Sequence, residues 1–172
     1  MLEGVFGYTA KESGLILALE GIAVILTISY VKDLVSKHSH MLIIATGFAI
    51  VGLAIISISF AYSIYTIIFL ILLFGAGYGL AQPLIDTQII HVAPSESTGG
   101  VLSIHNAMRN VGQSLAPIVL GIVLLHFDLN TVFIVSGSFG LLVALMTYLM
   151  KNFFENSGDK HIKEAKIPSS NQ

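Results

Sequence analysis

The chain has 172 residues, of which 55% are hydrophobic and only 10% are charged, and its mean hydropathy is +0.86. A soluble domain carries about 25% charged residues, so the composition excludes an ordinary soluble domain and indicates an integral membrane protein. A net charge of −2 without a basic patch argues against nucleic-acid binding, and the absence of cysteine excludes disulfides and thiolate metal sites.

Long apolar runs set the fold class. A hydrocarbon core of about 30 Å needs about 20 apolar residues per helix, whereas β-barrel strands would alternate in pieces of about ten residues. We therefore predict an all-α membrane protein with five transmembrane helices, at residues 13–32, 41–61, 64–92, 99–127 and 130–150.

The segments outside these spans are expected to be polar and external to the bilayer. Residues 1–12 contain Glu3, Lys11 and Glu12, so they lack the positive start of a signal peptide, and we interpret them as the remnant of an extracellular loop. Residues 151–172 are interpreted as a cytoplasmic tail that is mostly disordered beyond Asn156.

The distribution of lysine and arginine near the span ends predicts the orientation. With the N-terminus outside and the C-terminus in the cytoplasm of a cell-membrane protein, only Lys11 lies outside. The cytoplasmic side then holds Lys32, Lys37, Lys151, Lys160, Lys163 and Lys166.

Charges inside the spans are the first pointer to function. Only Glu20, Asp86 and Arg109 fall in the interior of an apolar segment. Such residues are costly in a bilayer and normally face a protein interior or a water-filled path. A carboxylate in such a path can carry a proton, so Glu20 and Asp86 are candidate proton carriers; a fixed ion pair is the alternative.

Depth along the helices suggests which of these groups meet. At 1.5 Å per residue, Glu20 and Arg109 both lie near the midplane, and Asp86 and His105 each lie about 9 Å from the cytoplasmic side. Two depth-matched pairs are therefore geometrically possible, Glu20 with Arg109 and Asp86 with His105. Asp86 reaching Arg109 instead is a further possibility.

Polar residues also recur along one face of three predicted helices. The stripes are Ser13, Glu20 and Thr27 on the first helix; Tyr78, Gln82 and Asp86 on the third; and Asn106, Asn110 or Arg109, and Gln113 on the fourth. Together they favour a shared aqueous pathway, with interhelical hydrogen bonding as the competing interpretation.

Small residues in the third and fifth spans indicate close helix packing. Gly75 and Gly79 form a GxxxG pattern, and Ser136 and Gly140 repeat the small-xxx-small spacing.

Signals for enzymatic chemistry are weak. The histidines follow no metal-binding spacing, and no nucleophile–histidine–carboxylate arrangement or phosphate loop stands out. We expect no enzyme activity, no cofactor and no metal site.

Four segments resemble the C-terminal half of a major facilitator superfamily transporter, spans eight to twelve, and in particular bacterial drug:proton antiporters. FGYTAKESGLILAL is similar to the start of span eight, FGAGYGLAQP to span ten, and VAPSESTGGVLSIHNAMRNVGQSLAPIVLG to the loop and span eleven. The loop from Ser29 to His38 resembles the family's inter-span motif G-x-x-x-D-R-x-G-R-R. Asp33 and Lys37 match it by character, whereas Ser29 and Ser36 replace glycines and Leu34 replaces arginine.

The resemblance implies a function for the polar stripes. In this family spans seven, eight, ten and eleven border the substrate cavity between two six-helix halves, and nine and twelve are peripheral. The site candidates are then Glu20, Asp86 and Arg109 for proton coupling; Tyr78, Gln82, His105, Asn106, Asn110 and Gln113 as cavity lining; and Asp33 and Lys37 in the loop motif.

The resemblance further implies a partial bundle. We expect the chain to be the C-terminal portion of a proton-coupled exporter of an amphipathic small molecule, inactive without an N-terminal half. Its partners would be the lipid bilayer, the substrate, protons and a separate N-terminal half. The alternatives are a small membrane protein that acts as an assembly subunit, and a metabolite uptake or efflux member of the same superfamily.

Overall fold

The computed structural model describes residues 10–94 and 96–165, and within them the regular elements are five helices. They are α2 (Ala10–Val35), α3 (His40–Ile58), α4 (Ile64–Val92), α5 (Thr98–His126) and α6 (Leu129–Ala165). In the described residues, five helical segments are long and apolar enough to cross a membrane, which confirms the predicted fold class. The ends of the predicted N-terminal loop and C-terminal tail, residues 1–9 and 166–172, lie outside the described residues.

Several helix ends differ from the sequence prediction. The first helix runs from Ala10 to Val35 and so extends three residues beyond residues 13–32 at each end. The second helix ends at Ile58 rather than at residue 61, because the Ser59 N–H bonds to the Ile56 carbonyl and the chain turns there. The last helix continues to Ala165, so the expectation of disorder beyond Asn156 was wrong for the described part of the tail. Its extension ends in the helix-favouring sequence KHIKEA, and no proline interrupts it before Pro168.

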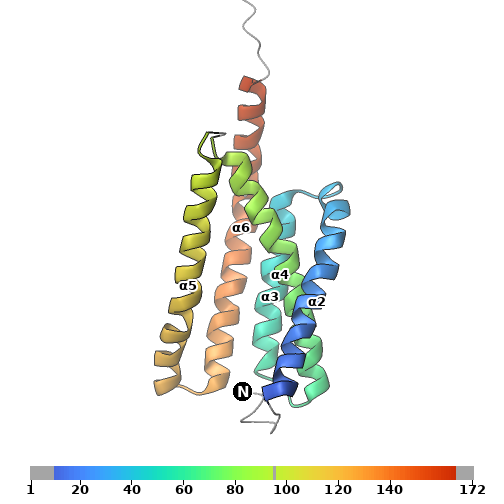
Figure 1. The fold of residues 1–172 in the computed structure, drawn as a ribbon, viewed down its shortest axis with the longest axis vertical. Helices are drawn as coiled ribbons and strands as arrows, with labels where there is room; N and C mark the ends of the chain where they lie inside the picture. The colour runs from blue at the N-terminus through green and yellow to red at the C-terminus, as the bar shows by residue number, and fades with distance from the viewer. Residues whose placement is uncertain (1–9, 95, 166–172) are drawn as a thin grey trace, which may run out of the picture.

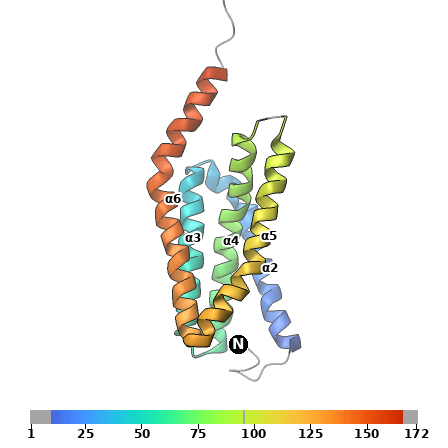
Figure 2. The same ribbon diagram turned by 90° about the vertical axis from the view of Figure 1, so that its left-hand side faces the viewer.

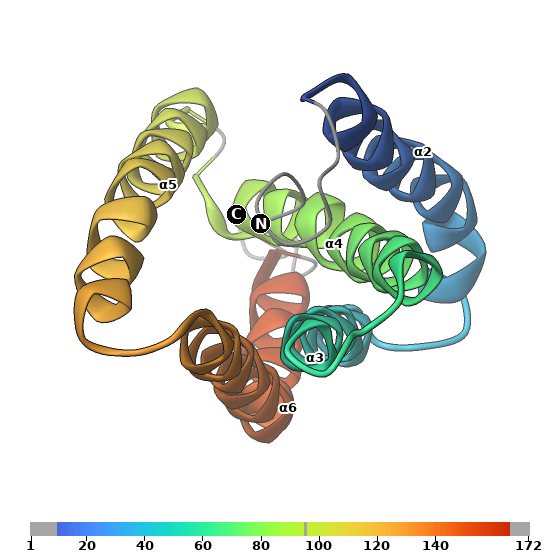
Figure 3. The same cartoon turned by 90° about the horizontal axis from the view of Figure 1, so that it is seen from below.

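The helices form an open bundle around α4. Helix α3 packs against α4 and α6, and α2 packs against α4. Viewed from below, α5 lies on one side of α4 and α2 on the other (Figure 3). Helix α5 makes few contacts, with α4 and α6, and none of its residues is buried.

Close backbone contacts hold the packed part of the bundle together. A β-carbon on Gly47 of α3 would lie 2.7 Å from the carbonyl oxygen of Gly77 on α4. Likewise, a β-carbon on Gly75 would lie 2.7 Å from the Glu20 carbonyl oxygen of α2. The glycine faces of α4 therefore let both neighbours approach to backbone distance, as in other membrane helix pairs.

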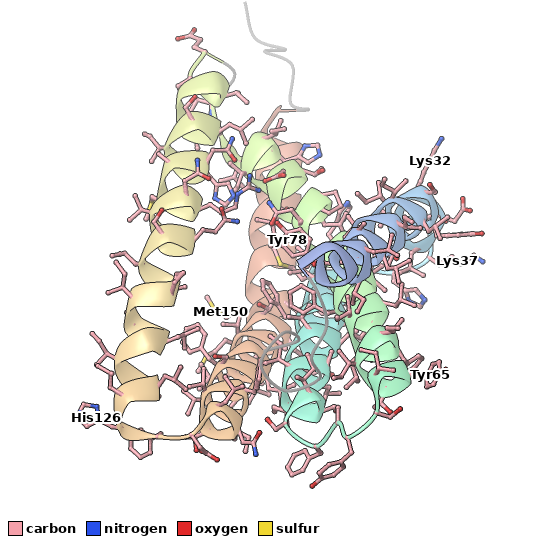
Figure 4. All side chains as sticks on the ribbon, turned by 60° about the horizontal axis from the view of Figure 1, so that its bottom comes forward. Lys32, Lys37, Tyr65, Tyr78, His126 and Met150 are labelled. Carbon is pink, nitrogen blue, oxygen red and sulfur yellow. The ribbon has the colours of Figure 1, made fainter. Side chains whose placement is uncertain are left out.

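The helix connections alternate between the two ends of the bundle. The α2–α3 and α4–α5 connections lie at the same end as the extension of α6 (Figure 1). Lys32 and Lys37 project outward at this end (Figure 4). Turning the molecule shows α3 and α6 side by side over the length of α3 (Figure 2).

Candidate functional site

Asp86 and His105 meet between α4 and α5. His105 Nε2 lies 3.5 Å from Asp86 Oδ1, and the exposed fractions of the two side chains are 28% and 36%. On the same helix, the Gln82 amide donates to both Asp86 carboxylate oxygens at 3.3 and 3.4 Å. Of the pairings that depth left open, Asp86 with His105 is therefore the one that forms, and Gln82 joins it because it lies one helical turn from Asp86.

Two nitrogen atoms on α5 keep unused hydrogen-bonding capacity. His105 Nε2 and Arg109 Nε are both buried, and neither has a hydrogen-bond partner among the described residues. His105 is near enough to Asp86 for an ion pair but is not aligned as a hydrogen bond. A buried polar atom without a partner is costly, so these two nitrogens are the donors in this region that the described protein groups leave unsatisfied.

The Glu20–Arg109 pair considered from depth alone is not formed. Among the described side chains, the one approach of a basic to an acidic group within 4 Å joins Asp86 to His105, and neither Glu20 nor Arg109 takes part in one. Glu20 belongs to α2 and Arg109 to α5, which lie on opposite sides of α4 (Figure 3). Equal depth therefore does not bring them together, and Asp86 likewise makes no ion pair with Arg109.

The cavity-lining candidates differ in exposure. Tyr78 is half-buried on α4 and lies toward the middle of the bundle, whereas Tyr65 and His126 point outward (Figure 4). Asn106 is half-buried on α5, and Asn110 and Gln113 are exposed. The polar stripe of α5 is thus largely uncovered by the described residues.

The loop-motif candidates lie at the α2–α3 connection. Asp33 and Lys37 are both exposed, and no ion pair within 4 Å is found between them. The Ser36 hydroxyl donates to the Asp33 carbonyl at 2.7 Å, and the Lys37 N–H donates to the Leu34 carbonyl at 3.1 Å. Backbone and hydroxyl hydrogen bonds therefore shape this turn without its charged groups.

Sequence reasoning missed one further feature, an apolar groove between α3, α4 and α6. Its lining includes Met41, Ile44, Phe48, Met146 and Met150. The methionines near the ends of two predicted spans were its only sequence signal. No cluster of potential metal ligands occurs in the described part of the chain.

The fold and the polar contact define an integral membrane protein with five spanning helices and ionisable side chains inside its spans. A family model described as Major Facilitator Superfamily matches residues 1–171. The chain belongs to this superfamily of membrane transporters.

Relatives within the superfamily are distant. The chain is 25% identical over 148 residues to the multidrug resistance protein MdtG of Enterobacter lignolyticus. This match covers 86% of the chain and 35% of the relative. It is 28% identical over 106 residues to the bacillibactin exporter of Bacillus subtilis, covering 62% of this chain and 26% of the relative. The MdtG protein of Dickeya zeae is 26% identical to the chain over 137 residues, and this match covers 80% of the chain and 34% of the relative.

The chain thus spans about a third of the length of the MdtG relatives it matches. No solved structure matches it significantly.

Proposed function

We propose that these five helices are the C-terminal portion of a secondary transporter that exports an amphipathic small molecule in exchange for protons. The observation that carries the proposal is the polar cluster of Gln82, Asp86 and His105 between α4 and α5 in a superfamily member. The name of one relative, the bacillibactin exporter, supports the direction of transport.

The cluster supplies groups suited to proton coupling. The Asp86 carboxylate can take up or release a proton, and Gln82 and His105 are close enough to orient it. Arg109 adds a fixed positive charge one turn beyond His105 on α5. A conformational change that separates α5 from α4 would alter the surroundings of the carboxylate, and this links protonation to alternating access.

Glu20 is a second candidate proton carrier in this scheme. It is half-buried on α2, where its backbone lies against Gly75. The orientation that we propose places the N-terminus outside and the C-terminus in the cytoplasm. The end of the bundle that carries Lys32 and Lys37 then faces the cytoplasm.

A cavity between two halves needs a second wall, and we expect this chain alone to be inactive in transport. The uncovered polar stripe of α5, with Asn110 and Gln113 exposed, favours a complementary helical partner. The same observation supports the second candidate function, a subunit that assembles with a separately encoded half. Co-purification of such a half with this chain from native membranes would support the subunit function.

Efflux measurements in cells that lack their own exporters test the main proposal. Cells would express this chain alone, or the native locus with its upstream sequence, and ethidium accumulation would be followed with and without a protonophore. We expect protonophore-sensitive efflux from the native locus only. Efflux from the chain alone would contradict the requirement for a second half.

Variants in the native locus test the assigned residues. Asp86→Asn, Glu20→Gln and Arg109→Ala should each lower efflux, whereas Glu96→Gln, an exposed carboxylate in the α4–α5 connection, should not. Wild-type efflux in all three site variants would remove the assignment. Uptake of a metabolite in place of dye efflux would favour the other transport alternative.

A further inference from the structure

An apolar groove of about 350 Å³ lies between α3, α4 and α6, on a part of the molecule that the proposed transport pathway does not use. Its walls include Phe48 of α3, Ile85 and Ile89 of α4, and Leu142 and Met146 of α6. Leu142 is 52% exposed and Met146 51%. The groove is therefore open to whatever surrounds the helices, and in a membrane that is lipid.

The groove continues into a second hollow of about 400 Å³ toward α5. The two share Met41, Gln88 and Ile89, and the second reaches Val101. Among the residues that the structure describes, no acidic side chain lines either hollow.

Two basic residues continue the groove walls at one end. On α6, Val143 and Thr147 line the groove, and Lys151 is the next residue at the same four-residue spacing. On α3, Ile44 and Phe48 line it, and His40 precedes them at that spacing. Both His40 and Lys151 are half-buried, and their spacing puts each of them one turn beyond the lining residues of its helix, at the same end of the groove.

The groove has the depth of part of one membrane leaflet. From Met41 to Phe48, α3 rises about 10 Å, compared with about 15 Å for half of the hydrocarbon core. It begins where α3 follows the α2–α3 connection, at the end of the bundle that carries Lys32 and Lys37 (Figure 4). An apolar ligand in it would therefore run along the helices, with its polar end at the membrane surface.

We propose that this groove binds one acyl chain of an anionic phospholipid, with the phosphate held by Lys151 and His40. Flexible methionine side chains adapt to an acyl chain that has no fixed conformation, and the lysine attracts the anionic headgroup. The apolar walls, the basic residues at one end and the lack of an acidic side chain among the described lining residues together select an anionic lipid over a zwitterionic one. This proposal needs only that the helices span a membrane and does not depend on transport.

A photoactivatable lipid tests the proposal directly on the wild-type chain. The full chain would be reconstituted in phosphatidylcholine vesicles containing a small fraction of phosphatidylglycerol or phosphatidylcholine with a diazirine on one acyl chain. We expect phosphatidylglycerol to label residues 41–48 and 142–150 in preference to the exposed face of α2, and several-fold more than phosphatidylcholine does. Equal labelling by the two lipids, or uniform labelling of all exposed helix faces, would overturn the proposal.

Matched variants separate the headgroup from the acyl chain. Lys151→Gln should lower the preference for phosphatidylglycerol about fivefold, the size expected for one lysine near a membrane surface. Lys32→Gln, an exposed lysine on α2, should leave it unchanged. An unchanged preference in Lys151→Gln would refute the role of the lysine.

The groove itself is tested by filling it. Thr147→Trp should reduce labelling of residues 41–48 by both lipids, whereas Tyr148→Trp, at a neighbouring position that is 55% exposed, should not. A photoactivatable amphipathic dye that labels the groove when the lipids do not would assign the groove to a transported compound and overturn the lipid proposal.

Discussion

The Nε2 atom of His105 lies 3.5 Å from Oδ1 of Asp86 and so connects α5 to α4 at a place where α5 has no buried residue. Helix α5 otherwise makes few contacts with the rest of the bundle. This polar contact therefore joins two helices that otherwise pack loosely, and one of them also carries Arg109.

This contact gives the first prediction. Asp86→Asn and His105→Ala should be coupled by about 0.6 kcal/mol, the average found for polar contacts between membrane helices. A double-mutant cycle on the unfolding free energy of the detergent-solubilised chain measures the coupling. As a control, Asp86→Asn with His126→Ala should show additive effects, because His126 lies at the other end of α5. Additivity for the first pair would mean that the contact does not position α5.

A second prediction concerns the contact between α3 and α6. A β-carbon on Gly137 would lie 2.6 Å from the Gly52 carbonyl oxygen and 2.5 Å from Cγ1 of Ile56. Gly137→Ala should therefore destabilise the chain by about 1–3 kcal/mol, as overpacked sites do. The thermal unfolding midpoint in detergent reports the change.

The chain offers a matched control for this substitution. A β-carbon on Gly121 of α5 would meet nothing within 4 Å. Gly121→Ala should leave the midpoint unchanged or raise it slightly, because alanine favours a helix by about 0.5–1 kcal/mol over glycine. A drop in Gly121→Ala as large as that in Gly137→Ala would show that backbone propensity and not the α3–α6 contact causes the loss.

The spans were predictable from the sequence because a bilayer forces each crossing to satisfy its backbone hydrogen bonds within one long apolar helix. The depth of each polar residue in the bilayer was predictable for the same reason, because it follows from counting residues along a helix. Equal depth was compatible with the observed contact between Asp86 and His105. Depth says nothing about the order of helices around the bundle. Glu20 and Arg109 therefore have equal depth and no contact, since α4 separates their helices.

Packing partners were the other part that the sequence left open. Gly75 and Gly79 were expected to pack closely, and a β-carbon on either would lie within 3 Å of an α2 carbonyl oxygen. The contact of Gly137 with α3 was not predicted, although Gly140 on the same helix was included. A small residue indicates that some helix can approach closely, but the sequence does not indicate which helix it is. The groove between α3, α4 and α6 was missed for the same reason, since it depends on three helices meeting.

A third prediction tests the pathway interpretation of the α5 stripe. The chain has no cysteine, so a single introduced cysteine can be labelled without background. Asn110→Cys and Gln113→Cys should react rapidly with a water-soluble maleimide in membranes, because the thiolate forms only where water reaches the thiol. Ile118→Cys, at a position 60% exposed on the same helix but apolar, should react slowly. Similar slow rates at all three positions would favour interhelical hydrogen bonding over an aqueous pathway.

The last prediction concerns pH and lies outside the membrane spans. Asp128 precedes α6, where its Oδ1 accepts hydrogen bonds from the hydroxyl and the backbone N–H of Thr131, the latter at 3.2 Å. These bonds, the hydroxyl bond first, lower the pKa of the Asp128 carboxyl below its ordinary value of 3.8. A lowered pKa means that the carboxylate stabilises the folded chain fully above the unfolded-state pKa of about 3.9, and that this stabilisation is lost as the pH falls through the folded-state value.

The substitution Asp128→Asn separates the charge from the cap. Asparagine still caps a helix but does not titrate, so the difference in unfolding midpoint between wild type and Asp128→Asn should shrink as the pH falls from 6 toward 3. Asp128→Ala, which removes the cap, should remain less stable than Asp128→Asn across the whole range. Thermal unfolding in detergent at each pH provides the comparison, and taking differences between variants cancels the titration of the other carboxylates. A wild-type advantage that grows on acidification would contradict the sign of the shift.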